Sequence, residues 1–316
     1  MASSVLKKYK LQIGISSVFL ILLISFIIAN PRVFFSFRTY TAVMTTLPIT
    51  IIVVVFLAYV IICAEIDLSF GSIMGLSAWT FTSMLVSTKN PILAVLLGIG
   101  VGLAAGALNG ILVTKARISS LVTTLGMAFF WRGVIMVGTQ GKGKPLVAFK
   151  GTAIYNTFVQ RITGGFPVQM LWAVGLTIIA WLILNWHRFG AHVYYTGDNE
   201  ESARMMGIKT DRVKIICFSL VGVASGFAGI ISVLVNLVFW PTCGEGMLLP
   251  VLAAVFIGGT PTWGGVGTIF GSFIGALIIG FIETGIISSG LTGFWTQLFY
   301  GLVIVLSLLT HRFLRK

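Results

Sequence analysis

Two acidic residues interrupt an apolar region in the first quarter of the chain. Glu65 and Asp67 lie in the sequence Ala-Glu-Ile-Asp-Leu-Ser-Phe-Gly-Ser (64–72), between two apolar runs. A charge near the bilayer costs at least about 2.5–3.5 kcal/mol, so it usually marks a cavity, an ion path or a broken helix. Three roles are open for Asp67: an interfacial turn, a cap on the helix that starts with Leu68 and Ser69, or a solute ligand. We favour the cap and keep Asp67 and Ser69 as candidates for the substrate path.

The most hydrophilic segment of the chain, 187–214, contains a predicted short helix. Asn199 is a suitable N-cap, and Glu200 and Glu201 suit a first helical turn, where backbone N–H groups are free. Gly207 suits the end of such a helix. We therefore expect a helix of about two turns in this segment.

The predicted helix is too short to be stable alone. Its Met205-Met206 pair is an adaptable apolar surface of the kind that docks into a groove. An ordinary solvated loop is the alternative, and we favour docking. The residues assigned to the docking helix are Asn199, Glu200, Glu201, Ser202, Ala203, Arg204, Met205, Met206 and Gly207.

A third candidate segment, 249–271, combines a short apolar helix, a glycine break at Gly258-Gly259 and a second helix with small residues. Small residues let helix backbones approach closely, so close packing is the expected role. A lining of the substrate path is the alternative, and it would involve Gly258, Gly259 and Thr260.

The sequence contains no catalytic constellation. The three histidines lack metal-ligand spacing, the three cysteines are far apart, and neither a Gly-x-Ser-x-Gly nor a phosphate-binding Gly-x-x-x-x-Gly-Lys-Ser/Thr motif occurs. We expect no cofactor, no metal and no enzymatic activity in this chain.

The elements that position these segments must be membrane-spanning helices. Hydrophobic residues make up 57% of the chain, charged residues only 9%, and the mean hydropathy is +1.03. Soluble domains carry about 25% charged residues, so this chain needs lipid as its solvent. The net charge of +13 is explained by basic loops on one side of a membrane, and no basic stripe indicates nucleic acid.

The apolar runs predict an all-α, polytopic transmembrane bundle of about ten spans, forming a single domain over 1–316. The polar segments between them, including 138–167 and 187–214, are too short for a separate soluble domain. The expected spans are 11–29, 42–63, 66–86, 92–114, 118–137, 168–186, 215–235, 248–257, 265–282 and 294–309.

Ten spans place both termini on one side, and the basic residues favour the cytoplasmic side. Thirteen Lys and Arg residues fall on the predicted inside, including Lys7, Lys8, Arg315 and Lys316, against seven on the outside. This bias has the sign expected for cytoplasmic loops.

A few other charged residues have more than one interpretation. Glu283 is either interfacial or a buried ion ligand, and Arg132 either snorkels or stacks on the adjacent tryptophan, or forms a gate. Lys142, Lys144 and Lys150 belong either to a solvated outer loop or to a surface that meets an acidic patch on a binding protein.

Three ordered blocks, within a region from about Pro48 to the C-terminus, resemble ribose-type ABC importer permeases. Residues 65–72 are similar to the family signature Gly-Ile-Asp-Leu-Ser-x-Gly-Ser, although the family has Gly-Gly where this chain has Ala64-Glu65. Residues 201–207 resemble the Glu-Ala-Ala-x-x-x-Gly coupling loop. Residues 253–260 resemble an Ala-Ala-Val-x-Ile-Gly-Gly-Thr run.

The resemblance implies a permease subunit of an ATP-driven importer for a monosaccharide or related polar solute. Separate ATPase subunits would dock on 199–207, a periplasmic or extracellular binding protein would deliver the solute, and a second permease copy or paralogue would complete the pore. The implied location is the bacterial plasma (inner) membrane. The main rival is an ion-coupled secondary transporter in which Glu65, Asp67 and Glu283 bind the coupling ion.

Overall fold

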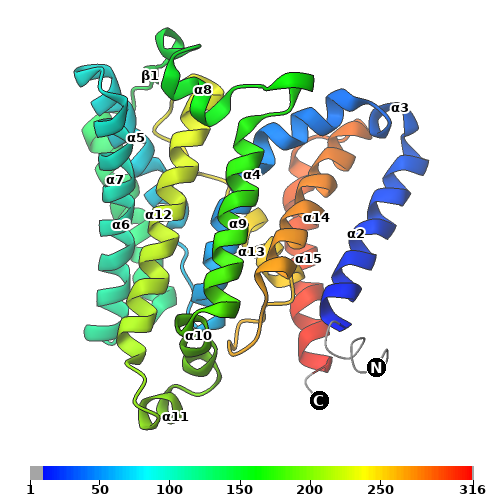
Figure 1. The fold of residues 1–316 in the computed structure, drawn as a ribbon. Helices are drawn as coiled ribbons and strands as arrows, with labels where there is room; N and C mark the ends of the chain where they lie inside the picture. The colour runs from blue at the N-terminus through cyan, green and yellow to red at the C-terminus, as the bar shows by residue number, and fades with distance from the viewer. Residues whose placement is uncertain (1–9, 315–316) are drawn as a thin grey trace.

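The computed structural model describes residues 10–314, which form a helical bundle (Figure 1). The α-helices are α2 (Lys10–Ala29), α3 (Pro31–Phe34), α4 (Phe37–Ile62), α5 (Phe70–Thr88), α6 (Pro91–Lys115), α7 (Ser120–Thr139), α8 (Ala153–Val159), α9 (Val168–Trp186), α10 (Arg188–Asp198), α11 (Glu200–Met205), α12 (Thr210–Asn236), α13 (Leu248–Ile257), α14 (Ile269–Ser288) and α15 (Phe294–Leu314). Two short 3₁₀ helices, η1 (Val147–Phe149) and η2 (Thr163–Gly165), and a two-stranded sheet of β1 (Lys144–Pro145) and β2 (Val238–Phe239) complete the fold.

The all-α architecture is confirmed, and three helices form its centre. Most of α4, α12 and α14 is buried, whereas α2, α6, α7 and α9 expose most of their apolar surface. Exposed apolar helices are stable only in lipid or against another chain. The chain is therefore built around α4 and α12, with an outer layer that faces the membrane.

The number of spans is only partly confirmed. Within the described residues, seven helices are long and apolar enough to cross a membrane: α2, α4, α6, α7, α9, α12 and α14. The expected spans at α5, α13 and α15 do not meet this measure, and α13 has only ten residues. The terminal residues Lys7, Lys8, Arg315 and Lys316 lie outside the described residues.

The two ends of the bundle differ. Helices α10 and α11 lie at one end, where α2 begins and α15 ends, and we call this the α11 end (Figure 1). The opposite end carries α8 and the pairing of β1 with β2, and we call it the β1 end. The polar segment 138–167 thus has more regular structure than its composition predicts.

Two predicted helix starts are wrong by a few residues. The span expected from Ile66 begins at Phe70, because the Asp67 carboxylate accepts the Ser69 N–H and holds the preceding backbone in a turn. The span expected from Gly265 begins at Ile269, where the Thr268 hydroxyl accepts the N–H three residues later.

Helix α10 was not expected within 187–214. Its N-cap is His187, whose Nδ1 accepts the Phe189 N–H at 3.1 Å. Gly197 lies so close to the Ile62 carbonyl that a β-carbon there would overlap it. The inner face of α10 therefore fixes the following helix, α11, close to the end of α4.

A seam of glycines joins α6 to α12. Gly102 and Gly106 on α6 face Gly222 on α12, and a β-carbon at any of them would meet backbone atoms of the other helix. Glycine at these positions lets the two backbones touch, which is a common way to pack helices in lipid. This seam holds α6 against the central helix α12.

The segment 249–271 packs closely, as expected. Helix α13 ends at Ile257, and a β-carbon at Gly258 would meet backbone atoms of Ser272 at 2.6 Å. Gly271 and Gly275 on α14 approach the carbonyl groups of Gly258 and Ala254 in the same way. The small residues thus serve the contact of α13 with α14.

Arg132 binds the chain that follows β2 through its guanidinium and does not stack on the ring of Trp131. Its guanidinium donates to the carbonyl oxygens of Pro241 (2.5 Å) and Cys243 (3.1 Å) and lies 3.4 Å from a carboxylate oxygen of Glu245. These residues belong to the connection between β2 and α13. Arg132 therefore fastens that connection to α7.

Candidate functional site: the α11 end of the bundle

The predicted helix at 199–207 is present as α11 and has the predicted caps. The Asn199 side chain accepts the Ser202 N–H at 2.9 Å. Gly207 has a φ of 82°, and its N–H donates to the Arg204 carbonyl at 2.9 Å. A left-handed glycine closes the C-terminus of a short helix in this way, so local sequence alone determines both ends of α11.

Helix α11 presents one apolar surface outward and anchors its other face. Met205 is 78% exposed and Met206 is 60% exposed, whereas Ala203 is fully buried. Two adjacent exposed methionines leave apolar area uncovered at this end of the bundle. The exposure is what the predicted docking role of this pair requires, and docking itself stays a prediction.

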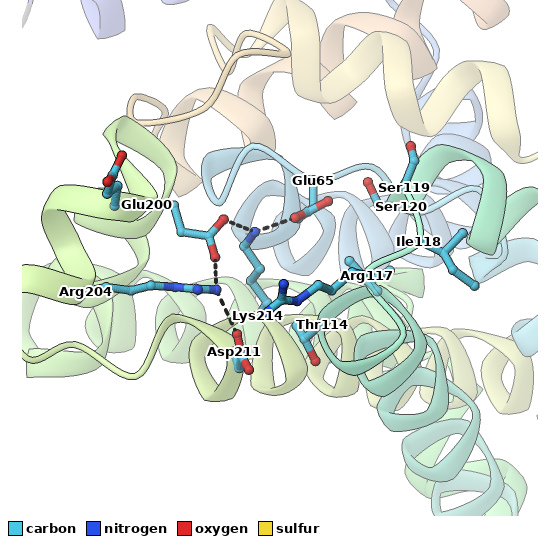
Figure 2. A pocket seen from close by; sticks show the side chains of 12 residues that line it. Glu65, Thr114, Arg117, Ile118, Ser119, Ser120, Glu200, Arg204, Asp211 and Lys214 are labelled. Atoms are coloured by element: carbon cyan, nitrogen blue, oxygen red, sulfur yellow. Dashed lines mark hydrogen bonds and ion pairs between the residues drawn. The ribbon is translucent and has the colours of Figure 1, made fainter.

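The inner face of α11 carries an ion-pair network (Figure 2). The ammonium of Lys214, in the first turns of α12, lies 2.6 Å from a Glu65 oxygen and 2.7 Å from a Glu200 oxygen. The second Glu200 oxygen accepts from Arg204 at 2.7 Å, and Arg204 also reaches Asp211 at 3.1 Å. Glu65 and Lys214 are almost buried, with side chains 13% and 11% exposed.

The network lines a cavity of about 600 Å³ that opens at the α11 end. Its walls come from α11, the start of α12, the connection of α6 to α7 with Arg117 and Ser119, and the first residue of α7, Ser120. Glu65 also lines this cavity, and Figure 2 shows the Lys214 ammonium between the carboxylates of Glu200 and Glu65. The cavity therefore extends from α11 to the segment that follows α4.

The charge of Lys214 keeps Glu200 ionised. Burial raises the pKa of Glu200, but the hydrogen bond and positive charge of Lys214 outweigh burial, so the pKa lies below its ordinary value. A carboxylate with a lowered pKa stabilises the fold at neutral pH, and this contribution is lost as the pH falls through the lowered pKa. The network is thus intact at neutral pH.

Beyond Glu65, the chain passes through a break between α4 and α5. Asp67 and Ser69 are fully buried there, and one Asp67 oxygen accepts both the N–H (2.7 Å) and the hydroxyl (2.6 Å) of Ser69. The side chains of Ser120 and Thr124 on α7 bind the N–H groups of the break, at Ile66 and Leu68, each at 3.1 Å. Asp67 therefore does not cap a helix that starts at Leu68, which is the role that the sequence favours: α5 begins at Phe70 with Ser69 as its N-cap, and Asp67 holds the turn just before it.

Asn109, on α6, completes this buried polar group. Its side-chain N–H donates to the Ser69 hydroxyl at 2.6 Å. The other Asp67 oxygen and the Asn109 carbonyl oxygen have no hydrogen-bond partner among the described residues. Buried polar atoms rarely lack partners, so the site has unused hydrogen-bonding capacity. A single asparagine in the apolar run 92–114 was the only sequence signal for it.

The other residues expected on a substrate path lie elsewhere. Gly258 contacts α14, and the Thr260 side chain lies beside Gly267, which in turn approaches Ile62. This places Gly258–Thr260 near the end of α4, and the structure gives no contact between them and Asp67. Glu283 is exposed and accepts the Tyr300 hydroxyl at 3.2 Å.

Replacing Asp67 by alanine should destabilise the chain. The Ser69 N–H and hydroxyl would then be buried without their acceptor, which costs about 1–3 kcal/mol for each unsatisfied group. Asp67→Asn keeps an acceptor oxygen and should cost less. Thermal unfolding of both purified variants in detergent tests this. Equal melting temperatures for wild type and Asp67→Ala would contradict a stabilising role for the two hydrogen bonds that Asp67 accepts from Ser69.

Sequence reasoning missed the partner of Glu65. Glu65 and Lys214 are far apart in the sequence, and neither flanking segment indicates that they meet. Lys214 was expected in a loop, whereas it lies in α12, which begins at Thr210. Within the described residues, no group of three or more His, Cys, Asp or Glu side chains is placed to hold a metal ion.

Comparison with known proteins identifies the class of protein. The family model described as "Branched-chain amino acid transport system / permease component" matches residues 39–308. The chain is 32% identical over 295 residues to the ribose import permease protein RbsC of Escherichia coli (strain K12), covering 93% of this chain and 92% of that protein. It is 35% identical over 256 residues to RbsC of Bacillus subtilis (strain 168), covering 81% and 79%.

A further relative is named for the import of a different solute. The autoinducer 2 import system permease protein LsrC of Yersinia pseudotuberculosis serotype O:3 (strain YPIII) is 33% identical over 275 residues, covering 87% of this chain and 77% of that protein. No solved structure matches the chain. The resemblance to ribose-type permeases found in the sequence is confirmed. The chain is a multi-pass membrane protein that belongs to the family of transport-system permease components.

Proposed function

We propose that this chain is the membrane-spanning permease subunit of an ATP-driven importer for a monosaccharide or a related polar solute. ATP hydrolysis takes place on separate ATPase subunits, and a binding protein outside the membrane delivers the solute. The named relatives, two for ribose and one for autoinducer 2, support this class of cargo.

The single observation that carries the proposal is the construction of α11. Its caps hold a short helix in place, Ala203 anchors it, and Met205 and Met206 are left exposed. Two exposed methionine side chains on a short, fixed helix are suited to insert into a groove on another protein. We assign the whole segment Asn199–Gly207 to the docking of an ATPase subunit.

The proposal includes the topology of the chain. With α5, α13 and α15 as further crossings, ten segments traverse the membrane and both termini lie in the cytoplasm with α11. A second permease copy, or a paralogue, covers part of the exposed apolar helices. The binding protein approaches the β1 end, where Lys142 and Lys150 are exposed.

The substrate path runs along the break between α4 and α5. Discontinuous helices often surround the solute site of a transporter. Asp67 and Asn109, which both bind the Ser69 hydroxyl, each keep an acceptor oxygen, free among the described residues, of the kind that sugar hydroxyls use. We place Gly258, Gly259 and Thr260 at the edge of this path, because Thr260 lies beside Gly267, which approaches Ile62 at the end of α4. ATP binding alternates the access of this path between the two sides of the membrane.

Transport by the native complex tests this proposal. The chain is purified with its associated subunits, reconstituted in vesicles with ATP inside, and offered radiolabelled monosaccharides with the native binding protein outside. We expect uptake that requires ATP and the binding protein. Uptake driven by a sodium or proton gradient, with no ATPase subunit present, would show a secondary transporter instead.

A further inference from the structure

We propose that Lys214 links the docking helix α11 to the break between α4 and α5, so that a movement of α11 displaces residues 64–69. Lys214 is then a positioning residue for transport. This inference rests on the proposed function, because it requires an ATPase that moves α11. It adds a defined mechanical connection between the ATPase-facing surface and the proposed substrate path.

The first step of the argument is the geometry of the link. One ammonium group bridges two carboxylates, at 2.6 Å to Glu65 and 2.7 Å to Glu200 (Figure 2). The three residues come from three elements: the segment after α4, the first turns of α12, and the first residue of α11. Neither carboxylate can move far without either taking the ammonium with it or losing its ion pair.

The second step is burial. Lys214 is 11% exposed and Glu65 is 13% exposed, so solvent screens their interaction weakly. Exposed ion pairs break and reform at little cost, whereas a buried charge that loses its partner is strongly unfavourable. The link between Lys214 and Glu65 therefore transmits displacement better than an ion pair at the rim of the cavity would.

The third step is what each end of the link holds. Glu200 directly follows the N-cap Asn199, so it moves with α11 as one unit. Glu65 lies two residues before Asp67, and its neighbour Ile66 is bound to Ser120 through its N–H. A displacement of Glu65 therefore acts on the hydrogen bonds that hold the break.

The fourth step concerns the sequence. Glu65 lies where the ribose-type signature has glycine, so the acidic end of the link is a feature of this chain rather than of the signature. Ala64, beside it, has a φ of 61°, a left-handed conformation that glycine adopts more easily. The chain thus has a left-handed turn at Ala64 and, next to it, a charge that reaches Lys214.

Amide hydrogen exchange of residues 64–69 in the assembled complex tests the link. In wild type, adding ATP should change the exchange rate of this peptide by about fivefold or more, a typical factor for coupled sites. Lys214→Met and Glu65→Gln should abolish the change, and uptake per ATP hydrolysed should fall by about tenfold. Lys214→Arg keeps the positive charge. This variant should retain much of the ATP-dependent change in exchange and much of the uptake per ATP hydrolysed.

Arg212→Met provides the matched control, because Arg212 is an exposed cation two residues away on the same helix. This variant should behave as wild type. Glu65→Gln changes the size of the side chain very little and should fold. It therefore tests the ion pair with Lys214 even if Lys214→Met folds poorly. The inference is overturned if ATP still changes the exchange of 64–69 in folded Glu65→Gln complexes, or if uptake per ATP is unchanged.

Two further outcomes concern the association of the chain with an ATPase, and they have different meanings. If the Lys214 and Glu65 variants fail to retain the ATPase during purification, the link holds the docking surface in place and does not transmit its movement, which also overturns the inference. If the wild-type chain never associates with an ATPase, the proposed function itself is wrong. Measuring the ratio of ATPase to permease in each preparation separates these cases.

Discussion

Replacing Met205 and Met206 together by glutamate should release the ATPase subunit and abolish uptake. Both side chains are exposed, so the permease should still fold. Inserting a carboxylate into an apolar groove removes the apolar contact and buries an unpaired charge. Losing a central docking residue typically costs about 2 kcal/mol or more, which is roughly 30-fold in affinity. Co-purification of the ATPase and uptake by reconstituted vesicles measure the effect.

Two variants control this experiment. Met205→Leu/Met206→Leu keeps an apolar knob of similar volume and should retain the ATPase. Val147→Glu places the same charge on an exposed apolar residue near the β1 end, and it should also have no effect on ATPase retention. Full uptake by the double glutamate variant would show that the methionine pair does not carry the docking.

Replacing Gly106 by alanine should strongly destabilise the bundle. Its β-carbon would meet the Phe218 carbonyl oxygen and lie 3.0 Å from the Gly222 Cα, and these backbone atoms cannot rotate away. Forcing apart a well-packed contact costs about 1–3 kcal/mol, occasionally more. We expect a lower melting temperature in detergent and a lower yield of monodisperse protein.

Gly100 is the matched control on the same helix. A β-carbon at Gly100 has nothing within 4 Å, so Gly100→Ala adds no clash. Alanine favours helix over glycine by about 1 kcal/mol, so this variant should be as stable as wild type or more so. Gly106→Ala should lower the stability and Gly100→Ala should not, although the two positions are six residues apart on one helix. This difference separates the effect of packing from that of helix propensity. Equal losses of stability in both variants would contradict the claim that Gly106 is required for the close packing of α6 against α12.

The helix α11 could be predicted from the sequence because its determinants are local. Asn199 and Gly207 define its ends through hydrogen bonds within a few residues. The exposure of Met205 and Met206 follows from the same short stretch, since a six-residue helix buries only one face. Long apolar runs likewise predicted the positions of most large helices.

The charged network could not be predicted, because it depends on tertiary contacts. Glu65 meets Lys214 only when α4 and α12 pack side by side, and the sequence around either residue contains no sign of the other. Asn109 reaches Ser69 for the same reason. Helix α10 was missed because the segment was interpreted from its polarity, although Val193 and Gly197 lie on one helical face.

Site-specific crosslinking from α11 is the most direct test of the proposal that this surface docks an ATPase. A photo-crosslinking amino acid is placed at Met205 in cells that express the native transport system, with the same amino acid at Val147 as a control. We predict a crosslinked product with an ATPase subunit from position 205 and none from 147. Efficient incorporation at 205 without any ATPase adduct, in cells that import the solute, would contradict the account.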